Sequence, residues 1–300
     1  MLNKVAIPTI CLHLLLVGSA LGRNPLAPAV SQQSSKPQAA PAAISVVVLD
    51  HNGQPVTELD QSEIQIFVNK ERVPVESVSH APDAPAEIAI LIDTSNSGRG
   101  FLQDLRWKDD TEPTAQLVRS GDRACVATFS EVNRLISPMT SDVAQIRAAL
   151  HTAIFEAPPG RGTALYDAMF SAATAAYSSQ SSHKALVVLS DMGDNQSFHT
   201  RSEVAEQAKR LGIRIFPIIP LAQIGASRRE EWVAKSLASL TGGTDYVVKP
   251  GQLRTIFAAI SADIREIYTI SFRPKCSAHG PLKIQCTRKG VKIVALEQTF

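Results

Sequence analysis

Strand-like and helix-like segments alternate along residues 86–265, and this alternation constrains the fold more than any other feature of the chain. Continuous apolar runs, typical of strands buried on both faces, lie at 88–92, 124–129, 185–189, 213–219 and 246–248. Helical periodicity is found between and after them, at 143–155, 164–177, 202–211, 230–240 and 253–267. We therefore predict a doubly wound α/β domain with a mostly parallel, Rossmann-like sheet. Pro217 predicts that its strand ends early, and residues 133–136 suggest an antiparallel edge strand.

The segments on both sides of this domain have β character. Residues 43–82 contain three strand-like runs and an Asn-Gly turn signal, and residues 266–300 contain three more runs. A unit of this size is too small to bury a core alone. Because domain termini often lie close together, we predict that the two units pair into one small β-sandwich-like module.

The N-terminal residues have the pattern of an export signal. Lys4 precedes a mostly apolar stretch, and small residues near position 20 offer a cleavage site, so residues 1–22 are predicted to be a signal peptide. A membrane anchor is less favoured, because the apolar run is short of about 20 residues and contains Pro8 and His13. We therefore predict a secreted or periplasmic protein without a stable membrane anchor. Residues 23–42, rich in Pro, Ala, Ser and Gln, are predicted to be a disordered linker.

Charge and cysteine content narrow the possible partners. The formal net charge is +2, aromatic residues make up only 5% of the chain, and no dense Lys/Arg run is present, which argues against nucleic-acid binding. Cys125 lies in an apolar run and is predicted to be a buried small hydrophobe. Cys276 and Cys286 flank a turn, and in an oxidising compartment they are a possible disulfide, although the sequence does not give their Cα separation.

Three polar segments are expected at the carboxyl ends of the strands, where open α/β sheets bind ligands. The first holds Asp93, Ser95 and Ser97, the second holds Thr163 before a helix, and the third holds Asp191. A hard cation such as Mg²⁺ takes oxygen ligands of this kind. Two carboxylates balance a divalent charge and the hydroxyls add none, so a carboxylate from a partner is a favoured further ligand. No general base is evident beside the set, which favours binding over hydrolysis.

Simpler structural roles are open for the same side chains. Asp93 and Ser95 are residue types that cap helices, and Thr163 stands immediately before one. Asp167 lies one turn into that helix and is expected to bond nearby loop amides. Residues 194–195 are expected in a solvated turn, with support of the metal ligands as the alternative.

The order of these motifs resembles a known family. Asp-x-Ser-x-Ser at 93–97 looks like the metal-ion-dependent adhesion site of von Willebrand factor type A domains, and the segments 162–168 and 189–191 resemble those that carry the site's threonine and last aspartate. The β flanks resemble those of secreted bacterial proteins related to this family. The resemblance implies direct ligation of Mg²⁺ or Mn²⁺ by the three hydroxyls, with the two aspartates acting largely through water. Met192 departs from the pattern, since glycine is common there, and Pro113 interrupts the expected first helix.

Three functions are compatible with these features. The leading hypothesis is a non-enzymatic binding module that recognises an acidic group on a protein partner. The alternative is a scaffold or assembly subunit in which the metal only stabilises the loops. A metal-assisted hydrolase is less favoured, because no phosphate-binding glycine motif, nucleophile elbow or second metal cluster is present.

Overall fold

The computed structural model describes residues 41–98, 102, 113–178, 181–220, 228–249, 251–274 and 281–296. The predicted signal peptide, the predicted linker up to residue 40, and Cys276 lie outside these residues. Among the described residues, no helix combines the length and the apolar composition needed to cross a bilayer.

A six-stranded sheet forms the centre of the larger domain. Its strand order is β10-β9-β8-β5-β6-β7, and all neighbours are parallel except β6 and β7. The strands are β5 (Ala86–Asp93), β6 (Arg123–Phe129), β7 (Asn133–Thr140), β8 (His183–Leu189), β9 (Ile213–Pro220) and β10 (Tyr246–Val248). The predicted doubly wound, mostly parallel sheet is therefore confirmed.

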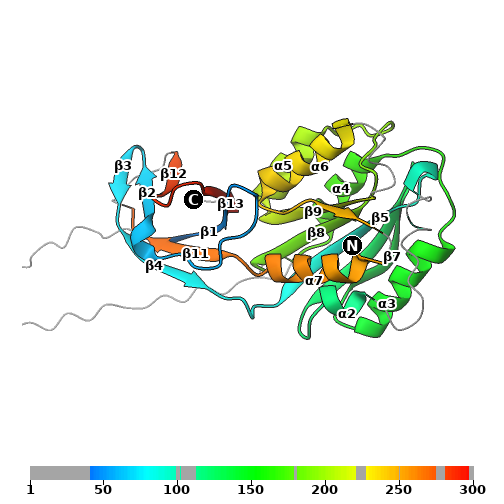
Figure 1. The fold of residues 1–300 in the computed structure, drawn as a ribbon, viewed down its shortest axis with the longest axis horizontal. Helices are drawn as coiled ribbons and strands as arrows, with labels where there is room; N and C mark the ends of the chain where they lie inside the picture. The colour runs from blue at the N-terminus through cyan, green and yellow to red at the C-terminus, as the bar shows by residue number, and fades with distance from the viewer. Residues whose placement is uncertain are drawn as a thin grey trace, which may run out of the picture. The chain divides into compact units, whose positions relative to one another are not determined.

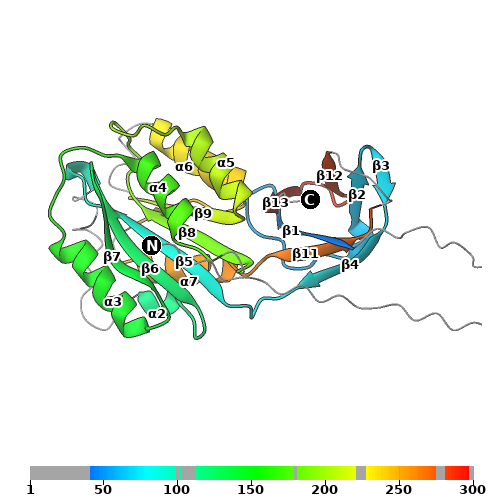
Figure 2. The ribbon, with the colours of Figure 1, turned by 180° about the vertical axis from the view of Figure 1, so that it is seen from behind.

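Helices cover both faces of this sheet, as Figures 1 and 2 show from opposite sides. They are α2 (Thr114–Leu117), α3 (Val143–His151), α4 (Leu165–Ala175), α5 (Arg201–Arg210), α6 (Arg228–Thr241) and α7 (Leu253–Asp263). A π-helical turn, Thr152–Glu156, extends α3. Alternate residues of β5 enter two apolar clusters: Ile90 packs with α2, α3 and α7, whereas Leu91 packs with α4, α5 and α6. All eight residues of β5 are buried, which explains the continuous apolar run.

Local capping fixes where several helices begin. Asp142 accepts hydrogen bonds from two amides of the first turn of α3, and Thr200 and Glu203 form a reciprocal capping box at α5. Pro113 stands at the N-cap of α2, before the helix rather than inside it, so it leaves the backbone hydrogen bonds of α2 intact.

The expectation that β9 ends early at Pro217 is wrong. β9 continues to Pro220, and Pro217 pairs with Val188 of β8. The carbonyl of Ile218 accepts a hydrogen bond from Ser190 on the β8 side, so the backbone of Pro217 faces the opposite side of the strand. There, β10 begins only at Tyr246, opposite Ile218. The missing N–H of Pro217 therefore breaks no ladder bond in the described sheet.

The flanking strands form two antiparallel sheets. The first has the order β13-β1-β11-β4 and the second β12-β2-β3. The strands are β1 (Ala42–Leu49), β2 (Ile64–Val68), β3 (Glu71–Val73), β4 (Val75–His80), β11 (Tyr268–Phe272), β12 (Leu282–Cys286) and β13 (Lys292–Leu296). Their inward side chains share one apolar cluster that includes Val46, Ile66 and Ile270. Strands from both ends of the chain thus build the small β-sandwich-like module that the sequence predicts.

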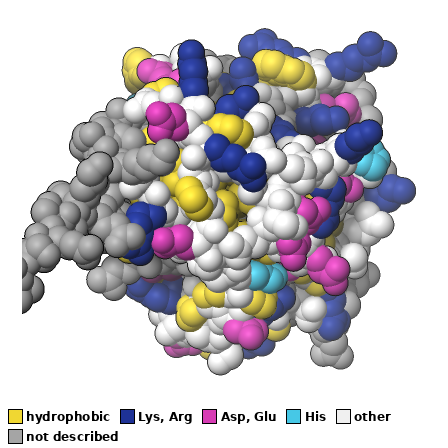
Figure 3. Space-filling model, turned by 90° about the vertical axis from the view of Figure 1, so that its left-hand side faces the viewer, with side chains coloured by type: hydrophobic (Ala, Val, Ile, Leu, Met, Phe, Trp, Pro, Cys, Tyr) yellow, Lys and Arg dark blue, Asp and Glu magenta, His cyan; other side chains and the backbone are white. Residues whose placement is uncertain are grey.

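One face of the molecule is shown in space-filling form in Figure 3. Acidic and basic side chains are intermixed on it, with small hydrophobic groups between them.

Asp122 joins three segments at the amino-terminal edge of the central sheet. Its Oδ1 accepts a hydrogen bond from Ala86 N at the start of β5, and its Oδ2 accepts from Arg119 N. The same Oδ2 lies 2.6 Å from Nη2 of Arg265, two residues past the end of α7. The Asp122 side chain is 1% exposed and that of Arg265 is 4% exposed. Because water reaches neither charge, each is compensated mainly by the other.

His183, the first residue of β8, is a buried histidine at the same edge. Its Nδ1 lies 2.8 Å from Ser182 Oγ, whereas Nε2 has no hydrogen-bond partner in the described part of the chain. Burial, together with the charges of Arg265 and Arg214, lowers the pKa of His183 to about 4. The folded protein therefore holds this ring neutral where an unfolded chain would protonate it.

We expect His183 to make the fold sensitive to acid. Between the ordinary pKa of 6.5 and the folded value of about 4, the unfolded state binds more protons, so stability falls as the pH is lowered through this window. Replacing His183 with glutamine should remove a component of about 3 kcal/mol from the difference in unfolding free energy between pH 7 and pH 4. Urea unfolding of both proteins at pH 7, 5 and 4 measures it. Parallel pH profiles would contradict this assignment.

Candidate metal centre

Asp93 is the last residue of β5 and is completely buried. Its Oδ1 accepts a hydrogen bond of 2.9 Å from Ser95 N, and its Oδ2 accepts one of 2.6 Å from Ser190 Oγ. Burial raises the pKa of Asp93 to about 6, the bonds from Ser190 and Ser95 oppose that shift, and the charge of Asp191 adds to it. The carboxylate is therefore held in a site where negative charge is poorly stabilised by solvent.

Ser95 and Ser97 lie two residues apart on the loop that follows β5. Their Oγ atoms are 3.3 Å apart, and Ser95 Oγ also accepts a hydrogen bond from Gly98 N. Ser95 is 2% exposed, whereas Ser97 is exposed to solvent. Ser95 thus caps the turn that follows it, which is the simpler structural role expected from the sequence. Its hydroxyl also lies beside that of Ser97.

Thr163 lies on a loop that contacts the Asp93 loop directly. Gly160 forms a parallel bridge with Ser95, and Gly160 N donates to Thr94 O at 3.0 Å. A Cβ atom at Gly160 would come within 2.2 Å of Ser130, so only glycine permits this close approach. Thr163 itself is 4% exposed.

Asp191 follows the buried Ser190 at the end of β8. Its Oδ1 accepts a hydrogen bond from Gly193 N, and its side chain is partly buried. Met192, next in the chain, has a φ of +64°, a left-handed conformation that glycine adopts without strain. Methionine therefore stands in a strained backbone conformation at the position where glycine is common in the family. Its side chain is 1% exposed and packs in the core.

Hydrogen bonds link the three loops in a closed set. Ser190 Oγ donates to Asp93, Gly160 N donates to Thr94 O, and Thr163 N donates to Asn195 Oδ1 at 2.9 Å. Each loop is therefore bonded to both others. This geometry gathers the segments that carry all five predicted ligands: Asp93, Ser95, Ser97, Thr163 and Asp191.

Residues 194–195 are not only a solvated turn, as the sequence suggests, but also bond the loop that carries Thr163 and the start of α4. Asn195 holds the Thr163 amide, and its own N–H donates back to Thr163 O at 3.0 Å. Asp194 Oδ2 accepts from Tyr166 N in the first turn of α4 and from Ser197 Oγ. These contacts, and the hydrogen bond from Ser190 to Asp93, do not follow from the sequence, because the partner of a loop side chain depends on the packing of a distant loop.

Asp167 has the structural role expected from the sequence. Its carboxylate accepts hydrogen bonds from the backbone amides of Phe198 and His199, and His199 Nδ1 lies 2.7 Å from its Oδ1. These bonds lower the pKa of Asp167 despite partial burial, which acts in the opposite direction. The loop after β8 is thus tied to α4 at two places, Asp167 and Tyr166.

The donor set fits a hard divalent cation. It consists of carboxylate and hydroxyl oxygens, the ligand type that Mg²⁺ prefers, and a cation would compensate the desolvated charge of Asp93. In the part of the chain that the structure describes, no group of three or more His, Cys, Asp or Glu side chains is placed to hold a metal. The candidate centre would therefore depend on its uncharged hydroxyls.

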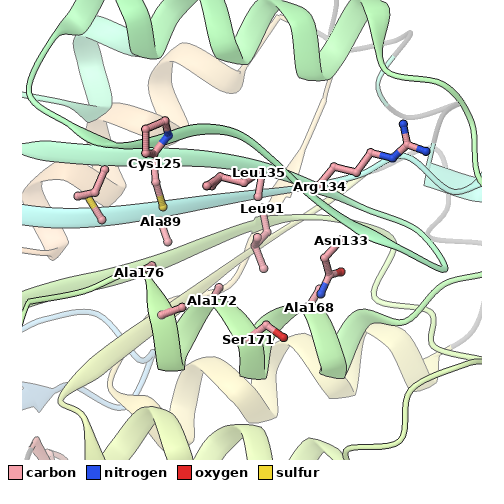
Figure 4. A pocket seen from close by; sticks show the side chains of 14 residues that line it. Ala89, Leu91, Cys125, Asn133, Arg134, Leu135, Ala168, Ser171, Ala172 and Ala176 are labelled. Atoms are coloured by element: carbon pink, nitrogen blue, oxygen red, sulfur yellow. The ribbon is translucent and has the colours of Figure 1, made fainter.

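A separate pocket of about 380 Å³ lies between α4 and strands β5 to β7 (Figure 4). Its walls are mostly apolar and include Leu91, Cys125 and Ala172. Burial raises the pKa of the Cys125 thiol to about 11, so the thiol stays protonated near neutral pH, as expected for a small core residue. None of the five candidate metal ligands lines this pocket.

Comparisons with known proteins bear on the same region. The family model for the von Willebrand factor type A domain matches residues 88–194, a span that contains all five candidate ligands. Three solved structures are similar to part of this chain. BatB from Bacteroides thetaiotaomicron is 18% identical, with a TM-score of 0.46, over 60% of this chain and 97% of that one.

The second is proximal thread matrix protein 1 from the mussel byssus, in a structure described as having a zinc-occupied MIDAS motif. It is 16% identical, with a TM-score of 0.48, over 64% of this chain and 48% of that one. The third is the vWF domain of the type V pili tip protein Mfa5 from Porphyromonas gingivalis, which is 13% identical, with a TM-score of 0.48, over 60% and 95% of the two chains. A comparison with curated proteins gave no match.

Proposed function

We propose that this chain, whose residues 88–194 belong to the von Willebrand factor type A domain family, is a non-enzymatic binding protein that recognises an acidic group on a protein partner through a bound Mg²⁺ or Mn²⁺. The metal would be held by Asp93, Ser95, Ser97, Thr163 and Asp191. The observation that carries the proposal is the closed set of hydrogen bonds that gathers these three loops around a buried carboxylate. The proposal includes export, which rests on the apolar segment within residues 1–22.

The balance of charges explains why an acidic ligand is favoured. Two aspartates neutralise a divalent cation, while the three hydroxyls contribute oxygen atoms without charge. A metal held in this way remains electrophilic and keeps positions for water or an incoming oxygen. A glutamate or aspartate of a partner would displace water and place a charged oxygen directly on the metal, beside the neutral hydroxyl ligands.

Two synthetic peptides test this proposal. Both are Gly/Ser-rich nonapeptides, one with a central glutamate and the other with glutamine. We expect the mature protein to bind the glutamate peptide in the presence of Mg²⁺ or Mn²⁺ and to lose that binding in EDTA, as measured by isothermal titration or NMR shifts. Thr163→Val, which removes one hydroxyl and retains the branched shape, should weaken peptide binding at least tenfold. Equal binding of the two peptides, or binding that ignores the metal, would refute the proposal.

A scaffold whose metal only stabilises the loops is the second candidate. The desolvated charge of Asp93 favours it, since a cation would relieve that charge without any partner. It predicts that Mg²⁺ raises the melting temperature while neither peptide binds with or without metal.

A further inference from the structure

We propose that the partner is recognised at a second place beside the metal, by an aromatic rim that consists of Phe198, Trp232 and the Arg201 that lies over Trp232. The preferred ligand would then be an extended segment that presents an acidic side chain to the metal and an apolar side chain to the rim. This inference rests on the proposed function and adds the partner's second determinant.

The two aromatic side chains are unusually exposed. Phe198 is 96% exposed, the highest value among the large hydrophobic side chains of the described residues, and Trp232 is 57% exposed. Trp and Arg are among the side chains most enriched in the energetic anchors of interfaces, and Phe is enriched in interfaces relative to the rest of the surface. Their position next to the candidate metal centre therefore needs an explanation beyond the fold.

The backbone beneath Phe198 is held rigidly although its ring is in solvent. Phe198 N donates to both oxygens of Asp167, at 3.1 and 3.0 Å, and the next residue, His199, donates its amide to the same carboxylate at 2.8 Å. The His199 ring stacks on Phe170 of α4 with centroids 3.9 Å apart. Since the backbone is already held, only the side-chain rotamers of Phe198 have to be ordered when a partner covers the ring, which lowers the entropic cost of binding.

Trp232 is positioned by an arginine from the neighbouring helix. The Arg201 guanidinium carbon lies 4.4 Å from the centroid of the indole, and Arg201 also donates a hydrogen bond to Ser236 Oγ. Arg201 begins α5, two residues after His199, and Trp232 lies in the first turns of α6. The rim is thus assembled from two helix starts and the loop that precedes one of them.

The rim lies next to the candidate ligands. Asn195 Oδ1 accepts a hydrogen bond from Thr163 N. Phe198 lies three residues after Asn195, so the Cα atoms of Phe198 and Asn195 are at most about 11 Å apart. Tyr166, three residues past Thr163, is near enough to Arg201 to interact with it electrostatically. An extended peptide advances about 3.3–3.6 Å per residue, so an apolar residue some three to five positions from the acid would reach the rim.

Charge around the centre suits an acidic segment. Arg161, on the Thr163 loop, is exposed, and Arg201 is part of the rim. The nearby Glu131 accepts hydrogen bonds from the amides of Arg161 and Gly162, and Glu203 closes the capping box of α5. Glu131 and Glu203 are thus engaged by amides and a hydroxyl of the protein, whereas Glu230 and Glu231 lie beside Trp232 in the first turn of α6. The exposed Arg161 is therefore the positive charge on the Thr163 loop best placed to attract a partner carboxylate.

Peptides that add one aromatic residue test the rim. The glutamate nonapeptide is compared with versions that carry phenylalanine three, four or five positions from the glutamate, and with the matching glutamine versions, all in Mg²⁺. We expect the best glutamate–phenylalanine peptide to bind about tenfold more tightly than the peptide with glutamate alone. Phe198→Ser and Trp232→Ser should each lose most of that gain and leave Mg²⁺ affinity and melting temperature unchanged. Leu240→Ser, at the other end of α6 and 40% exposed, is the matched control and should retain it.

The outcomes separate the two proposals. If the glutamate peptides bind with metal but the gain from phenylalanine is absent, or survives both rim substitutions, the rim is wrong and the metal-dependent function stands. If the glutamine–phenylalanine peptides bind as tightly as their glutamate counterparts, the rim acts apart from the metal and the inference is also wrong. If no glutamate peptide binds in Mg²⁺, both proposals fail.

Discussion

Replacing Asp93 with asparagine should weaken Mg²⁺ and Mn²⁺ binding by about 100-fold or more and leave the metal-free fold at least as stable as the wild type. Substitution of groups that only support metal ligands already lowers metal affinity by about 10- to 100-fold, and Asp93 is one of two charges in the proposed centre. Asparagine keeps the acceptor for Ser95 N and removes the charge that burial disfavours. Since burial moves the pKa of Asp93 from 3.8 to about 6, relief of that charge is worth up to about 3 kcal/mol at pH 7.

Calorimetric titration and thermal unfolding, each with and without metal, check both parts of this expectation. Wild type at a metal concentration of 100 times its dissociation constant should gain about 2.7 kcal/mol in unfolding free energy, whereas Asp93→Asn at the same concentration should gain about 0.4 kcal/mol or less. Asp142→Asn is a suitable control, because that carboxylate caps α3 outside the three loops. Undiminished metal binding by Asp93→Asn would remove this residue from the centre.

Replacing Asp122 with alanine should destabilise the protein by about 3–5 kcal/mol without altering the candidate ligands. The substitution removes the partner of a buried Arg265 and leaves that charge uncompensated, which is the costly case for buried ion pairs. It also leaves the amides of Ala86 and Arg119 without their acceptor.

A double-variant cycle isolates the contribution of the ion pair. Arg265→Met combined with Asp122→Ala removes both charges, and we expect it to recover a large part of the loss seen for Asp122→Ala alone. Unfolding free energies from urea titration at pH 7 measure each variant. Additive losses in the double variant would show that the two side chains stabilise the fold independently.

The parts of the site that follow from strand periodicity could be predicted from the sequence. The apolar runs ending at Ile92 and Leu189 locate two strand ends, and parallel strands bring their carboxyl ends to one edge of the sheet. The type and order of the polar residues there then suggest a hard cation. Each of these steps uses only local pattern and a general property of parallel sheets.

The supports of the site could not be predicted in this way. The bonds from Asn195 to Thr163 and from Ser190 to Asp93 join residues far apart in the chain, and their loops have no periodicity. The prediction that β9 ends at Pro217 was wrong for a related reason. Whether a missing N–H breaks a ladder bond depends on which neighbouring strand the residue faces and where that strand begins. The exposure of Phe198 likewise depends on how Asp167 orients a loop, which the sequence of the loop does not reveal.

The shared sheets of the flanking strands impose an order on biosynthesis. β1 pairs with β11 and β13, and β2 pairs with the nearby β3 on one edge and with β12 on the other, so the pairings with the C-terminal strands form only after residues 81–267 have been translated. At roughly 5–20 residues per second, that interval is on the order of ten seconds or more. During it β1 and one edge of β2 lack these partners, and at its end the α/β domain has its complete sequence while β11, β12 and β13 are still to be made. The α/β domain is therefore complete before the β module can close, and in the meantime the unpaired edges of β1 and β2 are exposed to mispairing with another chain.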